Sequence, residues 1–95
     1  MIKVVAVKKV KKDNHKEHEK LLKEMVQETL KEKGCISYGA YEDAKDCCKI
    51  TILEEWESQE HLDCHMASEH FKRLVPQMTK LAEGPSDISI LKKLF

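Results

Sequence analysis

Hydrophobic and polar positions divide the chain into segments with a two-residue period and segments with a helical period. Residues 2–10 (IKVVAVKKV) alternate, with apolar side chains on both sides, and predict a first strand whose two faces both need cover. Asn14 and Glu17 have the spacing of a capping box, so a helix is expected to begin at Asp13 or Asn14 and to end at Gly34. Its buried face is predicted from apolar residues at helical spacing: Leu21, Leu22, Met25, Val26 and Leu30.

The middle of the chain predicts a hairpin followed by two helices. Residues 35–42 and 47–56 alternate as strands, and the polar link 43–46 is the turn between them. Ser58 and Ser68 belong to a residue type that favours the N-cap position, so each is expected to begin a helix. The second helical region is therefore predicted to be split just before Ser68.

The last third of the chain continues the second of these helices and then returns to a strand. Pro76 lies inside a helical pattern of apolar residues, which predicts a kink or the loss of one hydrogen bond. Gly84 and Pro85 are expected to end the helix, and residues 86–94 to form the last strand.

These elements follow the order strand, helix, strand, strand, helix, strand. Two such units meeting in one antiparallel sheet give an α+β, ferredoxin-like β-α-β-β-α-β fold, and the length fits one domain over residues 1–95. Helices can cover only one face of this sheet. Apolar residues on the other face, such as Val5, Val7, Leu53 and Leu91, would then meet water, so we expect a second copy to cover them in a homodimer.

Composition and charge narrow the classes of partner. Lys and Arg together number 17, as do Asp and Glu, so no electrostatic footprint for nucleic acid or an anionic membrane is expected. The basic cluster at residues 8–12 is interpreted as a solvated strand end. No apolar run resembles a secretion signal or a membrane helix, which favours the cytoplasm. In that reducing compartment four cysteines are expected to be free thiols: Cys35, Cys47, Cys48 and Cys64.

Three of the five histidines lie between Glu54 and Pro76. His61 and His65 share a helix face at a spacing that can hold a metal, but HLDCH lacks the glutamate of the metalloprotease motif, and zinc would need further ligands. Unrelated histidines on a solvated face are the simpler interpretation, and no metal is expected. His65 and His70 flank a helix break, where a histidine either moves a proton near neutral pH or satisfies backbone groups at a helix end.

Four large apolar side chains are candidates for the walls of a pocket beside these histidines: Trp56, Tyr38, Phe71 and Leu74. Trp56 ends the third predicted strand, while Phe71 and Leu74 lie on the apolar face of the last helix. Membership of an ordinary core is the competing interpretation for each of them.

The run EEWESQEHLDCHMASEHFKRLVP resembles the antibiotic biosynthesis monooxygenase (ABM) family, whose small stand-alone members include the quinol monooxygenase type. Residues 32–43 (EKGCISYGAYED) are similar to the second strand of that family, and the order of elements agrees over the whole chain. The features that carry the resemblance are Glu55-Trp56 at the end of a strand, Ser58 at the start of a helix, His65, and Ser68-Glu69-His70-Phe71-Lys72.

The resemblance implies a dimeric α+β barrel with one pocket per subunit between the sheet and the helices. It also implies an oxygenase that uses dioxygen on a quinol or polyphenol-like aromatic without metal, flavin or another cofactor. A deprotonated substrate of this kind can pass an electron to dioxygen, so the protein supplies orientation, a dry pocket and a proton acceptor. We assign the acceptor role to His65 first and His70 second, with Trp56, Tyr38 and Phe71 as walls for a flat ring.

Relatives of this family with other activities leave alternative functions open. Haem-degrading relatives carry an axial histidine on the third helix and an asparagine on the first strand. Here Val75 takes the position of that histidine and the first strand has no asparagine, which argues against haem. Relatives that isomerise or process a phosphorylated autoinducer-2-type signal share the two histidines and a Gly-Pro like Gly84-Pro85. A non-catalytic small-ligand-binding module is a further alternative, because one fold hosts many functions.

Overall fold

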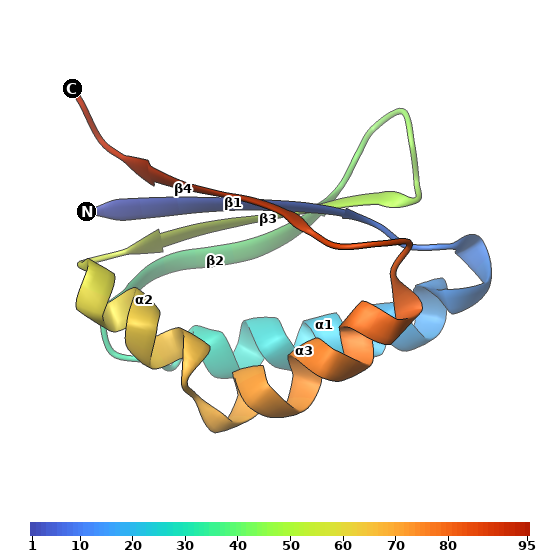
Figure 1. Ribbon diagram of the computed structural model, residues 1–95, viewed down its shortest axis with the longest axis horizontal. Helices are drawn as coiled ribbons and strands as arrows, with labels where there is room; N and C mark the ends of the chain where they lie inside the picture. Colours follow the sequence, from blue (N-terminus) through green and yellow to red (C-terminus); the bar gives the residue numbers. More distant parts are fainter.

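The computed structural model describes residues 1–95 and has two layers, a four-stranded sheet with the helices packed against one of its faces (Figure 1). The predicted β-α-β-β-α-β order, with its second helical region split in two, is confirmed. The elements in chain order are β1 (Ile2–Lys9), a short 3₁₀ helix η1 (Lys12–Asn14), α1 (His15–Thr29), β2 (Cys35–Glu42), β3 (Lys49–Trp56), α2 (Gln59–Met66), α3 (Glu69–Leu81) and β4 (Asp87–Lys92).

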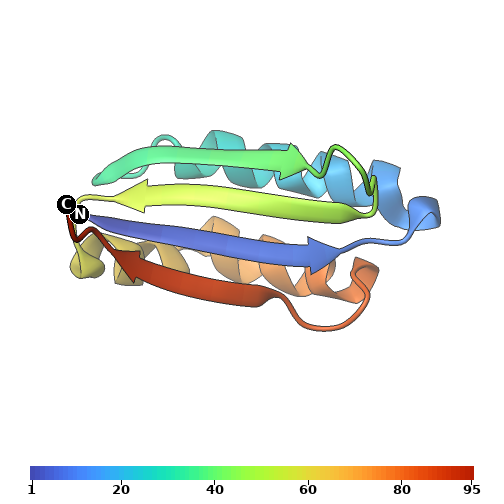
Figure 2. The same ribbon diagram turned by 90° about the horizontal axis from the view of Figure 1, so that it is seen from above.

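The strands lie in the order β2-β3-β1-β4, and every neighbouring pair is antiparallel (Figure 2). On β1, Val4 is opposite Glu54 of β3 on one side and Ile90 of β4 on the other. Because side chains alternate along a strand, the even-numbered positions of β1 and β3 face the helices. Both chain ends lie at the same end of the sheet (Figure 2).

An irregularity in β2 changes which of its side chains faces the helices. The register shifts between Cys35 and Ser37, so that Cys35 is opposite Trp56 and Ser37 is opposite Glu55. Strict alternation would place Ile36 beside Tyr38 on the covered face. The bulge places Cys35 against the core instead and leaves Ile36 exposed.

Two of the three predicted helix caps are confirmed. Ser58 Oγ accepts a hydrogen bond from the backbone N–H of His61, and Ser68 Oγ accepts one from Phe71, both at 3.3 Å. The prediction of a capping box at Asn14 is wrong. Its side chain donates to the carbonyl of Leu81 at 3.1 Å, so it ties the start of α1 to the end of α3 instead of capping its own helix.

Helix α1 ends at Thr29, five residues before the expected stop at Gly34. The segment between them is a turn, and Gly34 follows it with φ of +84°, a conformation that favours glycine. A Cβ at Gly34 would also overlap the ring of His61, which packs directly on this turn. The turn from α1 into β2 is therefore fixed both by backbone conformation and by close packing.

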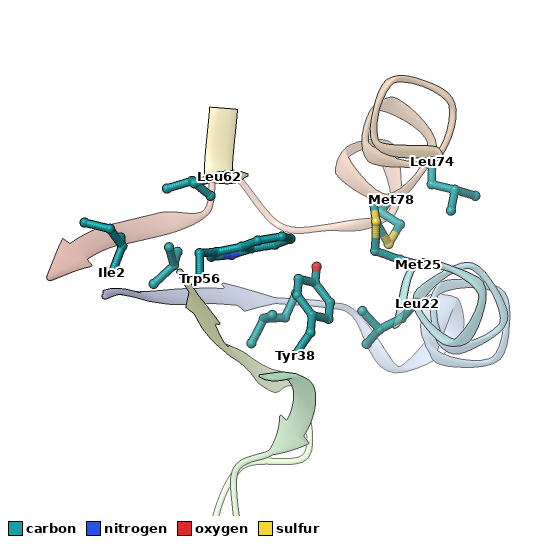
Figure 3. Packing of buried hydrophobic residues seen from close by; sticks show 10 residues of the cluster. Ile2, Leu22, Met25, Tyr38, Trp56, Leu62, Leu74 and Met78 are labelled. Atoms are coloured by element: carbon teal, nitrogen blue, oxygen red, sulfur yellow. The ribbon is translucent and has the colours of Figure 1, made fainter. Parts of the chain in front are cut away.

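The core lies between the sheet and the helices (Figure 3). Trp56 is fully buried with Ile2 and Leu62 nearby, and Tyr38 extends from β2 with its hydroxyl toward the space next to Met78 (Figure 3). Helix α3 continues through Pro76. No helix is both long and apolar enough to serve as a membrane span.

Candidate active site

A cavity of about 140 Å³ lies between the sheet and the helices. Most of its lining is apolar, with Tyr38 on the sheet side and Phe71 on the helix side. The polar side chains in its lining are fewer: Lys8, Glu54, His65, Thr79 and Ser86. Mainly apolar walls with a few polar groups are the usual lining of a site for a small molecule.

His65 is the histidine that reaches this cavity. It lies in the last turn of α2, its side chain is 2% exposed, and its Nδ1 is 2.6 Å from Oε2 of Glu32. A carboxylate only accepts hydrogen bonds, so the Nδ1–H of His65 donates. In the neutral ring Nε2 is then the unprotonated nitrogen and can accept a proton.

The Nε2 atom of His65 has no hydrogen-bond partner in the protein, yet it is not sealed off. Among buried side-chain nitrogen and oxygen atoms, only Nε2 of His18 is both fully enclosed and without a partner. Nε2 of His65 must therefore retain some accessible surface, and His65 lines the cavity. This nitrogen is therefore free to accept a hydrogen bond, and the residue that carries it lines the cavity.

Aromatic rings hold the His65 imidazole in place. Its ring centroid is 4.8 Å from that of Trp56, 5.1 Å from that of Phe71 and 5.6 Å from that of Tyr38. Together with the bond to Glu32, these contacts restrict both the position and the rotation of the ring. Burial lowers the pKa of His65, against the opposing effect of Glu32, so the neutral, proton-accepting form is favoured at neutral pH.

His70 meets the same carboxylate from another side. Its Nε2 is 2.9 Å from Oε2 of Glu32, with the hydroxyls of Ser68 at 3.3 Å and Thr29 at 3.5 Å. His70 is not part of the cavity lining. The structure thus brings the two predicted histidines together through Glu32 but directs only His65 to the cavity.

Of the four predicted wall residues, the structure places two at the cavity. Tyr38 and Phe71 line it, whereas Trp56 and Leu74 do not. Trp56 lies behind His65, and its Nε1–H donates to Oε1 of Glu54 at 2.9 Å. Leu74 is fully buried in the core, because it lies on the side of α3 that packs within the molecule.

Two acidic residues of the site were missed by sequence reasoning. Glu32 lies in the turn after α1, 33 residues before His65, and only the fold brings them together. Glu54 is in β3, is 7% exposed and lines the cavity, and burial raises the pKa of its carboxyl. Glu54 is two residues before Trp56 in the same strand, so alternation places both side chains on the face toward the helices. This was the signal that the sequence offered.

Lys8 also differs from expectation. The sequence suggested a solvated strand end, but the even-numbered side of β1 faces the helices, and Lys8 lines the cavity. Its burial lowers the pKa of its ammonium group to about 8.

Glu32, His65 and His70 are the side chains that could hold a metal, since their ligand atoms all lie within 4.8 Å of one another. Two histidines and a carboxylate are a set that zinc and iron use. However, tetrahedral zinc separates its ligand atoms by about 3.3 Å. The 2.6 and 2.9 Å separations here are hydrogen-bond lengths, so an ion would have to push the groups apart. His61 is bonded to Ser58 and does not join them.

A larger cavity of about 440 Å³ lies between α1 and the β2 and β3 strands. None of the six predicted site residues lines it. Its polar lining comes mainly from the side of α1, including His15, His18 and Lys23. The pairing of His65 with Glu32 lies instead at the smaller cavity, which is therefore the candidate for chemistry.

The fold and this enclosed histidine–carboxylate pair define a small α+β protein with a cavity between one sheet face and its helices. Residues 1–77 match the antibiotic biosynthesis monooxygenase family, and the chain belongs to that family.

Solved structures agree with this assignment. A conserved protein from Methanosarcina mazei Go1 is 39% identical, with a TM-score of 0.95 over 97% of this chain and 91% of that one. An antibiotic biosynthesis monooxygenase is 31% identical, also with a TM-score of 0.95, over 99% of both chains.

Two curated proteins are similar in sequence. The protein sll1783 of Synechocystis is 32% identical over 88% of this chain, and Rv0793 of Mycobacterium tuberculosis is 34% identical over 78% of it. The chain spans only 57% of the length of the first and 72% of the second.

Proposed function

We propose that the protein is a monooxygenase that inserts oxygen from dioxygen into a quinol or polyphenol-like aromatic without a metal, flavin or other cofactor. Membership of the ABM family supports the reaction class. The single observation that carries the proposal is His65, which is held by Glu32 at the wall of a cavity lined by aromatic and aliphatic side chains.

The chemistry balances with substrate and dioxygen alone. A quinol with a free ring C–H reacts with one O₂ to give a hydroxyquinone and one water. One oxygen atom forms the new C–O bond and the other leaves as water. The aromatic loses four electrons, and dioxygen gains four. Deprotonation of the hydroxyl group is the step that the protein assists, because the resulting anion is the better electron donor.

His65 is the proposed proton acceptor for that hydroxyl. Its Nε2 is available, and the imidazolium formed when it takes the proton is stabilised by the adjacent Glu32 carboxylate. Tyr38 and Phe71 supply flat contacts for the substrate ring, and the mainly apolar lining limits water. His70 acts through Glu32 in this scheme and does not touch the substrate.

Dioxygen uptake with a panel of quinols and polyphenols tests the proposal. His65→Ala should lower the rate by about 10²–10⁴-fold, the usual range for loss of an acid–base group. His70→Gln should have a smaller effect, because the cavity keeps its acceptor. Unchanged uptake in His65→Ala would remove its role. No uptake with any member of the panel would favour the isomerase or ligand-binding alternatives.

We also propose that a second copy of the chain covers the helix-free face of the sheet. That face carries apolar side chains in contact with water, among them Leu53 at 38% and Leu91 at 45% exposure. Sheet-to-sheet packing would bury them and form the expected homodimer. Light scattering after size-exclusion chromatography tests this, and Leu53→Lys should shift the protein to the monomer mass. A wild-type protein of monomer mass would contradict the proposal.

A further inference from the structure

The active-site cavity has a basic end as well as a histidine end. Lys8 lines it from β1, together with the hydroxyl residues Thr79, in the last turns of α3, and Ser86, just before β4. The sheet register separates the two ends. Glu54 is opposite Val4, and Lys8 is four residues farther along β1, about 13 Å away at the usual rise per residue.

Lys8 has no acidic partner within the protein. Strand β1 carries two other lysines, and each is paired: Lys3 with Glu55 at 3.3 Å and Lys9 with Asp46 at 2.9 Å. Lys8 is half-buried and forms no ion pair, and its pKa is lowered by burial with no nearby carboxylate to oppose the shift. Lysines that are taken out of water are normally paired, so the missing partner is the unusual feature.

No charged side chain in the surrounding elements substitutes for that partner. His18 of α1 lies close enough that the charge of Lys8 lowers the pKa of its imidazole, so His18 is a neutral neighbour and offers no negative charge. The α3 residues in the lining are uncharged: Phe71, Val75, Met78 and Thr79. The other titratable groups in the lining, Glu54 and His65, belong to the opposite end.

We propose that Lys8 binds the carboxylate of a substrate that carries an acidic side chain on its phenolic ring. An anion at this place would accept a charge-assisted hydrogen bond from the ammonium group. This bond would replace the contacts with water that the ammonium group loses on burial. A single lysine near the C-terminal, negative end of α3 suits a singly charged group better than a phosphate dianion.

The size of the cavity narrows the substrate further. A volume of about 140 Å³ lies below the about 300–1,000 Å³ of most ligand pockets, which favours one ring with a short chain over a polycyclic molecule. The flexible four-carbon stem of Lys8 spans part of the distance between the two ends. This inference rests on the proposed function only in that it places the phenolic ring at His65.

Binding under nitrogen tests the charge preference without any turnover. Isothermal titration calorimetry would compare 3-(3,4-dihydroxyphenyl)propanoate with its neutral primary amide, two molecules of nearly equal size. We expect the wild-type protein to bind the carboxylate at least tenfold more tightly. Lys8→Met should bring the ratio of the two dissociation constants close to one, and Lys8→Arg should keep most of the preference for the carboxylate. Lys3→Met is the matched control, because it removes a lysine from the same strand on the opposite face.

The outcomes separate the two proposals. Equal binding of both compounds to the wild-type protein, no binding of either, or a preference that survives in Lys8→Met would each overturn the role of Lys8. A preference that disappears only in Lys8→Met supports it. If that preference is present while dioxygen uptake is absent, the oxygenase proposal fails and the carboxylate site stands. Lys8→Met should melt at a temperature no lower than that of the wild-type protein, which excludes misfolding as the cause.

Discussion

His18 gives the stability of this protein a specific dependence on pH. Its side chain is 2% exposed, and its Nε2 is enclosed without a hydrogen-bond partner. Burial, together with the charges of Lys8 and His15, lowers the pKa of His18 from 6.5 to about 4. The folded protein therefore holds this imidazole neutral, while the unfolded chain can protonate it below its ordinary pKa.

The sign and size of the effect follow from linkage. The pKa is lower in the folded state, so stability is complete above the unfolded value of 6.5 and is lost as the pH falls toward 4. At pH 5 the unfolded chain binds the proton and the folded protein does not. With 1.36 kcal/mol per pKa unit, His18 alone should lower the free energy of unfolding by about 2 kcal/mol between pH 7 and pH 5.

His18→Leu removes the titrating imidazole, and with it this dependence of stability on pH, and places an apolar side chain in the core beside Leu22. Urea unfolding of both proteins at pH 7 and pH 5, at one protein concentration, measures the difference. Between pH 7 and pH 5, we expect the free energy of unfolding to fall by about 2 kcal/mol more in the wild-type protein than in the variant. Any change in packing affects the variant equally at both pH values, so it cancels in this difference. His15→Leu, one turn earlier on α1, should leave most of the His18 contribution in place, because burial is a larger cause of the lowered pKa than the charge of His15. Parallel pH dependence in wild type and His18→Leu would refute the reasoning.

Three further predictions concern the active site and the turn that carries it. Glu32→Gln should reduce dioxygen uptake at least tenfold with an unchanged melting temperature, because an amide no longer stabilises the charged His65 ring; full activity would show that Glu32 has no part in the reaction. Gly34→Ala should destabilise the protein by about 3 kcal/mol in urea unfolding, because of its positive φ and the overlap with His61; a loss below about 1 kcal/mol would contradict this. Treatment with EDTA should leave uptake unchanged, whereas loss of activity that added metal restores would assign a metal to Glu32, His65 and His70.

Local patterns in the sequence were sufficient to predict the fold. Period and turn residues located every strand and the long helices within a few residues, because each signal lies inside the segment that it describes. Ser58 and Ser68 predicted the helix starts for the same reason: a cap acts on its own first turn. Asn14 does occupy the N-cap position of α1, but its side chain makes no capping bond, because Leu81, 67 positions away, offers it another partner.

The site required contacts that no local pattern contains. His65 was found because it flanks a helix break within one short motif, but its partner Glu32 comes from the turn after another helix. The sharing of one carboxylate oxygen by His65 and His70 depends on how that turn packs against α2 and α3. Lys8 was assigned to solvent because neighbouring lysines suggested a charged strand end, although the alternation that places Val4 inward also turns Lys8 inward.

The shared carboxylate limits how the two histidines can be charged. Oε2 of Glu32 lies within hydrogen-bond distance of both rings, and Glu32 favours the protonated form of His65. A charge on His70, however, works against a second charge on His65, and burial of His65 acts in the same direction. In the proposed reaction, a proton taken from the substrate would be held at His65 only as long as Glu32 balances it, and it would be readily given back. A group that must accept a proton in one step and release it after oxygen transfer benefits from this balance more than from a strongly basic nitrogen.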